Sequence, residues 1–219
     1  YQVNGWLCRS FQLICLDHAT LMVSDAEGAQ EPLSLLGFID DLEETLGSTA
    51  IQPGFVNELK QTLIKDLQSS AWPTSVHDTP QSLSADELEQ YFTDAHSYHP
   101  CYKSRLGFSL RDNQHYGPEF AQPLKVLWLA VPRHFAHAGA VSGRSAADMA
   151  EAEAGASVLA RLEAYLSQRH LARDEVVLLP VHPWQWENAL VPALYPELAS
   201  GDIVLLGEGE TAYTAQQSI

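Results

Sequence analysis

The sequence predicts an α+β fold, with a helical N-terminal part to about residue 95 and a mainly antiparallel, sheet-containing part after it. Three observations support this prediction. Apolar residues recur at helical spacing in three stretches before residue 95. Short apolar runs of strand length lie after it, and the local charge of the chain changes sign near the same point.

The N-terminal part is expected to contain strand and then helix. Residues 6–23 alternate loosely between apolar and polar, which indicates one or two strands. Ser84 followed by Glu87 is typical of a capping box at the start of the third helix. The helices are expected from Pro32 to a stop at Gly47, from Pro53 to Ser70, and from Ser84 to about Ala95.

We interpret the apolar stripes of these helices as core packing and expect no chemistry before residue 94. The stripe of the second helix consists of Phe55, Val56, Leu59, Leu63, Ile64 and Leu67.

The C-terminal part is expected to supply the sheet. Three apolar runs predict buried strands at 126–131, 176–181 and 202–206. Between the first two, Ser145 and Asp148 predict the cap of one long Ala-rich helix that continues to about His170. The predicted domains are therefore 1–95 and 96–219.

Composition excludes several classes of protein. A net charge of −16 and a pI near 4.7 argue against nucleic acid as a partner. No apolar run reaches the roughly 18 residues of a membrane span. Three cysteines without a Cys-x-x-Cys spacing indicate reduced thiols and a cytoplasmic location. The start at Tyr1, without Met or a signal-peptide layout, is expected to be a cut or disordered boundary.

Residues 96–144 carry the opposite charge to the rest of the chain. Six basic and two acidic residues give this window +4, so the remainder of the −16 chain stands at −20. A cationic segment in an acidic chain indicates a site for an anionic ligand. Lys103, Arg105 and Gly107 suit phosphate or carboxylate, because they offer a point charge, a two-pronged donor and close backbone approach. A solvated loop is the alternative interpretation.

The histidines leave other interpretations open. His96 with His99, and His134 with His137, have the i, i+3 spacing of a metal pair, but no Cys or carboxylate completes either set. We therefore assign no metal site. His182 follows a predicted strand, where it could lie at a ligand-binding rim or pack in the core beside two tryptophans.

Three ordered motifs carry a resemblance to a known family. They are Tyr98-His-Pro-Cys-Tyr-Lys-Ser-Arg-Leu-Gly-Phe-Ser109, Tyr116-Gly-Pro-Glu-Phe120 and Leu179-Pro-Val-His-Pro-Trp-Gln-Trp-Glu187. Together they resemble the N-terminal half of the IucA/IucC family, the siderophore synthetases that work without nonribosomal peptide synthetases. The resemblance is strong over about residues 85–219.

The resemblance implies a fold and an activity. Family members have a hand-like fold with an N-terminal thumb, β-rich fingers and a helical palm. They use ATP and Mg²⁺ to adenylate a carboxylate of citrate or a related polycarboxylic acid, and an amine, hydroxylamine or alcohol then displaces AMP. This chain would comprise the thumb and part of the fingers. The palm, with the expected magnesium ligands, would be absent, so the chain alone is expected to be inactive.

The resemblance also assigns residues. The family's His-Pro-x-x-Lys-x-Arg-x-Gly run, matched by His99, Lys103, Arg105 and Gly107, lies in its ATP-binding region. We expect Lys103 and Arg105 to be exposed and to contact phosphates, so that alanine at either would slow adenylation with little effect on folding. His99 would form a hydrogen bond on the phosphate or adenine side.

Three further residues are included in the expected site. Ser218 would begin the family's Ser-x-Arg-Thr motif. His182 and Gln185 are expected to contact the ligand-binding residues and not the ligand itself. Alternatively, His182 could pack against the sheet. The catalytic residues themselves are not assigned.

Two other functions remain open at this point. One is a non-catalytic module that binds citrate or a siderophore through the same cationic loop. The other is a dimerisation module, since helical regions of this kind often build homodimers. The remaining expected partners are small molecules: ATP, a polycarboxylic acid and an amine or hydroxylamine.

Overall fold

The computed structural model describes residues 1–7, 14–24, 26, 28, 30–32, 34–47, 53–72, 80–91, 99–139 and 143–216. The chain forms two compact units, Tyr1–Lys60 and Gln61–Ile219, and helix α2 (Pro53–Ser70) runs through the boundary between them. The mixture of helices and antiparallel sheets confirms the α+β class. The thumb-like and fingers-like division at residue 95 stays a prediction.

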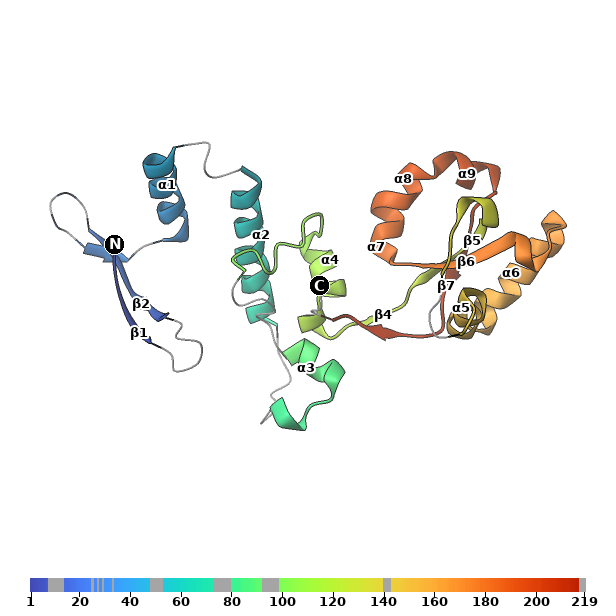
Figure 1. Cartoon of the computed structure of the whole chain (residues 1–219), viewed down its shortest axis with the longest axis horizontal. Coiled ribbons are helices and arrows are strands. Elements are labelled where there is room, and N and C mark those ends of the chain that lie inside the picture. The colour runs from blue at the N-terminus through green and yellow to red at the C-terminus, as the bar shows by residue number, and fades with distance from the viewer. Residues whose placement is uncertain are drawn as a thin grey trace. The chain divides into compact units, whose positions relative to one another are not determined.

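The first unit contains a three-stranded antiparallel sheet and helix α1 (Figure 1). Its strands are β1 (Gln2–Leu7), β2 (Ile14–Ser24) and β3 (Gln30–Pro32). Helix α1 (Leu35–Leu46) begins after Ser34, whose side chain accepts a hydrogen bond from the Gly37 amide, and ends at Gly47 with φ 86°. The prediction of one or two strands in 6–23 is confirmed by β2, and β1 lies mostly before that range. The helix with its glycine stop is also confirmed, although it begins at Leu35 and not at Pro32.

The second unit is organised around a three-stranded antiparallel sheet in the order β6-β5-β7. The central strand β5 (Leu127–Pro132) pairs with β6 (Val176–Val181) on one side and with β7 (Val204–Glu208) on the other. All three strands predicted after residue 95 are present, the last shifted by two residues. A second, smaller sheet pairs β4 (Pro123–Leu124) with β8 (Tyr213–Thr214).

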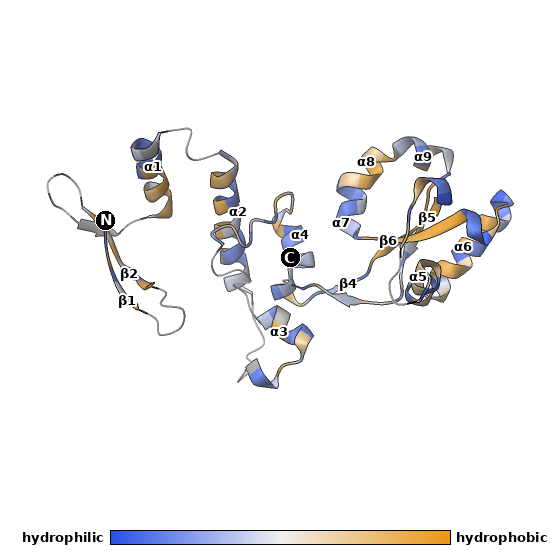
Figure 2. Cartoon of the chain, in the orientation of Figure 1, coloured by the Kyte–Doolittle hydropathy of each residue, from blue (hydrophilic) through white to orange (hydrophobic). Residues whose placement is uncertain are grey.

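Helices cover both faces of the three-stranded sheet. Trp128 and Ala130 lie in a core with α5 (Ala146–Ala154) and α6 (Ala156–Arg169), and Leu129 and Val131 lie in a second core on the opposite face. The helical stretch that follows β6 covers this second face (Figure 1). Alternate residues of a strand point to opposite faces, and both faces of this sheet are covered, so its strands consist mainly of apolar residues; Figure 2 shows this most clearly for β6.

The remaining elements are short. Helix α3 has the reciprocal Ser84–Glu87 cap that the sequence predicts, and residues 92–98 lie outside the described part of the chain. None of the described helices has the length and apolar character to cross a membrane. These elements are α3 (Ala85–Tyr91), α4 (Leu110–Tyr116), α7 (Pro183–Gln185), a π-helical turn η5 (Trp186–Leu190), α8 (Val191–Ala193), α9 (Tyr195–Ser200) and the 3₁₀ turns η1 (Pro80–Ser82), η2 (Pro118–Phe120), η3 (Arg133–Phe135) and η4 (Arg173–Glu175).

The long Ala-rich helix is two helices, so that prediction was wrong. Gly155 separates α5 from α6 with φ 83°, a conformation that a residue with a Cβ rarely adopts. The Glu210 carboxylate lies against Gly155 and accepts a hydrogen bond from the Ser157 amide at 2.9 Å. This hydrogen bond is the main reason that the pKa of Glu210 is lowered. The break therefore opens the amino end of α6 to a carboxylate from a distant part of the chain.

The packing of α2 also differs from the sequence prediction. The buried face of the segment after residue 60 is polar, with Thr62, Lys65 and Ser69 at helical spacing. Leu63, Ile64 and Leu67, which were expected in the core, are instead exposed. A polar stripe was visible in the sequence, but its burial depends on partners more than thirty residues away.

The three cysteines do not all fit the reduced setting inferred from their number. Cys15 in β2 is disulfide-bonded, contrary to the expectation of reduced thiols. Cys101 is a free and buried thiol.

The glycine break can be tested with Gly155→Ala in the 219-residue chain. A Cβ there would lie 2.7 Å from the Glu210 carboxyl carbon and would disfavour the positive φ. We expect a loss of about 1–2 kcal/mol in the free energy of unfolding, measured with urea. Gly139→Ala is the control, because no atom lies within 4 Å of that Cβ. Equal stability of the two variants would contradict a requirement for glycine at the break.

Candidate functional site

The cationic motif forms a loop of consecutive turns, residues 99–109, called the basic loop below. Its backbone amides at Tyr102, Ser104 and Phe108 donate to the carbonyls of the residues three positions earlier. Two residues have positive φ, Arg105 at 36° and Gly107 at 90°. The left-handed region is disfavoured for a residue with a Cβ, so contacts around Arg105 must hold it there.

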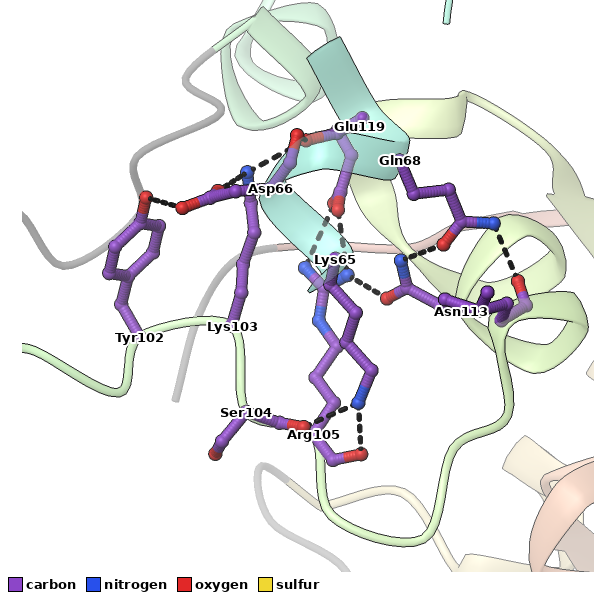
Figure 3. A network of polar contacts seen from close by, with 11 residues as sticks. Lys65, Asp66, Gln68, Tyr102, Lys103, Ser104, Arg105, Asn113 and Glu119 are labelled. Carbon is purple, nitrogen blue, oxygen red and sulfur yellow. Dashed lines mark hydrogen bonds and ion pairs between the residues drawn. The ribbon is translucent and has the colours of Figure 1, made fainter. Parts of the chain in front are cut away.

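Lys103 is buried in an ion pair with helix α2. Its Nζ lies 2.7 Å from Asp66 Oδ1 and 3.0 Å from Ser69 Oγ, and its side chain is 1% exposed. The Tyr102 hydroxyl donates to the other Asp66 oxygen at 2.5 Å. Figure 3 shows Tyr102 and Lys103 on either side of this carboxylate. The expectation of an exposed Lys103 was wrong, because its ammonium is buried against Asp66 and Ser69. The expected small effect on folding has therefore lost its premise.

Arg105 makes a second ion pair. Its two terminal nitrogens each lie 2.8 Å from an oxygen of Glu119, and one also donates to Asn113 Oδ1 at 2.6 Å. The Glu119 side chain is 1% exposed and that of Arg105 18%. This paired geometry requires a guanidinium, so lysine would not replace Arg105. Arg105 is therefore mostly buried. The expectation that its charge is exposed was wrong.

An amide chain links the Arg105 pair back to α2. Asn113 donates to Gln68 Oε1 at 2.9 Å, and Gln68 donates to the Leu110 carbonyl at 2.7 Å. Figure 3 shows this chain beside the Arg105–Glu119 pair. The basic loop is thus held at two points by buried polar contacts.

The same loop contacts the third sequence motif. A Cβ on Gly107 would lie 2.9 Å from the Trp184 ring, so this position requires glycine for close approach. The ring centroids of Phe108 and Trp184 lie 5.3 Å apart, and those of Tyr116 and His182 lie 4.5 Å apart. The first two motifs, which are close in the sequence, therefore meet the third, which lies more than sixty residues further along the chain.

The two His-Pro pairs share one local geometry. His99 Nδ1 accepts from the Cys101 amide and His182 Nδ1 accepts from the Trp184 amide, each at 3.1 Å. Proline has no N–H, so the next residue supplies the first donor that can reach back. A neutral imidazole that accepts at Nδ1 carries its proton on Nε2. Both histidines therefore offer an Nε2–H donor.

The surroundings of His99 and His182 differ. His99 is exposed at the start of the basic loop, whereas His182 is half-buried and packs on Tyr116. Burial lowers the pKa of His182, so its imidazole stays neutral near pH 7.

The other expected residues contribute less. Gln185 is exposed at the end of α7, and Ser218 lies outside the described residues. His96 lies outside them as well. Within the described ranges, no three His, Cys, Asp or Glu side chains group as a metal site would require.

The sequence interpretation missed the residues that hold the basic loop. Lys65, Asp66, Gln68 and Ser69 come from α2, which had been assigned to packing alone. Glu119 lies in a motif that was noted for its resemblance but was given no role. The spacing of Thr62, Lys65, Asp66 and Ser69 along one helix face was the available signal.

Breaking the Arg105 ion pair should destabilise the chain strongly. Glu119→Gln keeps the side-chain shape but removes the negative charge that both terminal nitrogens of the largely buried Arg105 face. We expect a loss of about 3 kcal/mol in the free energy of unfolding. Asp202→Asn is the control, because its pair with Arg169 is 55% and 40% exposed and is expected to contribute under about 1 kcal/mol. A small effect of Glu119→Gln, measured by urea unfolding, would contradict the importance of this pair.

His182 should make folding sensitive to acid. Its folded pKa lies below the ordinary 6.5, so the unfolded chain binds the proton more readily. Its contribution to stability is full above pH 6.5 and is lost as pH falls from there through the folded pKa. His182→Asn keeps an acceptor for the Trp184 amide but does not titrate. We expect a shallower acid loss of unfolding free energy in this variant, and an unchanged slope would refute the assignment.

The chain is similar to several known proteins. The IucA / IucC family matches residues 84–219. The chain is 34% identical to a citryl-spermidine/3,4-dihydroxybenzoyl-citryl-spermidine:spermidine ligase of Bacillus anthracis, over 100% of this chain and 36% of that protein. Two solved structures are also similar. They are the petrobactin biosynthesis protein AsbB of Bacillus anthracis (29% identity, TM-score 0.77, 97% of this chain and 34% of that one) and the aerobactin synthetase IucC of Klebsiella pneumoniae (25%, 0.73, 98% and 38%).

The chain thus spans about a third of the length of these relatives. The family match covers more than half of the chain and includes the motifs that meet at the basic loop. The chain belongs to the IucA / IucC family.

Proposed function

We propose that this chain is part of an ATP-dependent siderophore synthetase that adenylates a carboxylate of citrate or a related polycarboxylic acid. An amine, hydroxylamine or alcohol then displaces AMP to form the amide or ester. The observation that carries the proposal is the contact of the basic loop with the His182-Pro-Trp motif, in a chain of this family. Cytoplasmic location and homodimer formation remain predictions.

The reaction brings two anions together, which sets what the protein must supply. A carboxylate oxygen bonds to the α-phosphorus of ATP, and the bond to the departing pyrophosphate breaks. Fixed donors and positive charge near these oxygens lower the barrier. His99 offers an exposed Nε2–H at the entrance of the basic loop, and the loop backbone supplies further dipoles.

The contacts of Lys103 and Arg105 favour an indirect role in this site. Their nitrogens face Asp66, Ser69, Glu119 and Asn113, and direct contact with phosphate would break buried ion pairs. We therefore propose that they shape the basic loop while their charges contribute to its potential. Among the described residues, no three His, Cys, Asp or Glu side chains group together, and we assign no magnesium ligand to this chain. No step is assigned to magnesium.

The proposal can be tested by ATP–pyrophosphate exchange in an intact synthetase that contains this chain. Citrate-dependent exchange should be present in the wild type. His99→Ala should slow it by about 10²–10³-fold, the usual scale for one electrostatic donor. His137→Ala is the control, because His137 is an exposed histidine outside the three motifs. Normal exchange in His99→Ala would remove His99 from the site.

Two further outcomes separate the proposal from its alternatives. Citrate binding with no response to ATP would support a binding module. A concentration-dependent mass with no ligand response would support a dimerisation module. The 219-residue chain by itself is expected to release no pyrophosphate, and turnover comparable to that of an intact synthetase would show that the site was misplaced.

A further inference from the structure

A second lysine of helix α2 is buried beneath the basic loop. Lys65 is fully buried, and its Nζ donates to two consecutive backbone carbonyls, those of Ser104 and Arg105, the second at 2.8 Å. Figure 3 shows the ammonium pointing at both oxygens. Lys65 lies outside residues 84–219, the part that the family match covers.

The double contact selects one backbone conformation. In an extended chain, successive carbonyls point to opposite sides, so a single ammonium cannot reach both. Here Arg105 has φ 36°, and the two oxygens converge on one nitrogen. Lys65 therefore favours the compact turn over the extended alternative at the residue whose side chain pairs with Glu119.

Burying the Lys65 ammonium beneath the basic loop costs desolvation free energy. Burial, together with the charge of Arg105, lowers the pKa of Lys65 to about 8. Lys103 adds a further cation nearby, while Asp66 and Glu119 are the carboxylates of the cluster. An apolar side chain would avoid the desolvation but would leave two partly buried carbonyls without this donor.

We infer that Lys65 is a positioning residue of the ATP-binding region. It fixes the backbone of Ser104 and Arg105, and through that turn it sets the direction of the Arg105 side chain and the approach of Gly107 to Trp184. This inference rests on the proposed function of the basic loop. Lys65 itself touches no substrate.

The test uses Lys65→Met in an intact synthetase that contains this chain. A displaced loop should lower kcat/KM for ATP by about 10²-fold, the loss expected from a misplacement of about 1 Å. The KM for the carboxylic acid should change much less. Hydrogen exchange gives a readout without turnover: the amides of Tyr102, Ser104 and Phe108 should exchange faster.

Two variants on the same helix serve as controls. Lys60→Met removes an exposed charge and should change neither readout. Leu59→Ala deletes a buried side chain about 9 Å from Lys65 along the helix axis, and we expect it to destabilise the fold without moving the turn. At temperatures equally far below each variant's Tm, Leu59→Ala should keep its kcat/KM for ATP. Lys65→Gln retains a donor and should recover part of the loss.

The outcomes separate the two proposals. No ATP-dependent exchange in the wild type overturns the proposed function, while amide exchange still tests the hold of Lys65 on the turn. A normal kcat/KM in Lys65→Met, with an active wild type, overturns the positioning role. An equal loss in Leu59→Ala, or failure of both Lys65 variants to fold, would show that Lys65 contributes only to stability and would also overturn it.

Discussion

The basic loop depends on the neutralisation of buried cations by two carboxylates from other parts of the chain. Asp66 on α2 and Glu119 in η2 face Lys103 and Arg105, and neither cation could stay buried without its partner. The loop has little regular structure of its own, and its turns include a residue in the left-handed region. Its shape is therefore set mainly by ion pairs with segments that are distant in the sequence.

The three-stranded sheet has a different role, because it positions the second His-Pro motif beside this loop. Strand β6 is buried between two helical layers and ends at Val181, immediately before His182. The glycine at position 107 then allows Trp184 to pack directly on the loop. The end of a buried strand thus meets a loop held by ion pairs, and this explains how motifs about eighty residues apart come into contact.

Local features of the fold could be predicted from the sequence, and distant contacts could not. The helix at 35–46 and the strands at 127–132 and 176–181 follow from periodicity and from their glycine and proline boundaries. The break at Gly155 depends on Glu210, and the burial of Lys103 depends on Asp66. Neither partner is adjacent in sequence, so a cation in a turn-rich segment was interpreted as exposed. The resemblance located the motifs but not their partners.

The charged residues that cluster in the structure are not the same set as the cationic window of the sequence. Counting along the chain gave +4 to residues 96–144, but Asp66 and Lys65 enter the same cluster from outside that window. Counted over the described residues, the cluster holds three cations, Lys65, Lys103 and Arg105, and two carboxylates, an excess of one positive charge. With a pKa of about 8, Lys65 is mostly protonated at pH 7 and keeps that excess. Because the charges are buried, salt screens their field weakly, and they can favour an anion at the loop surface without contacting it.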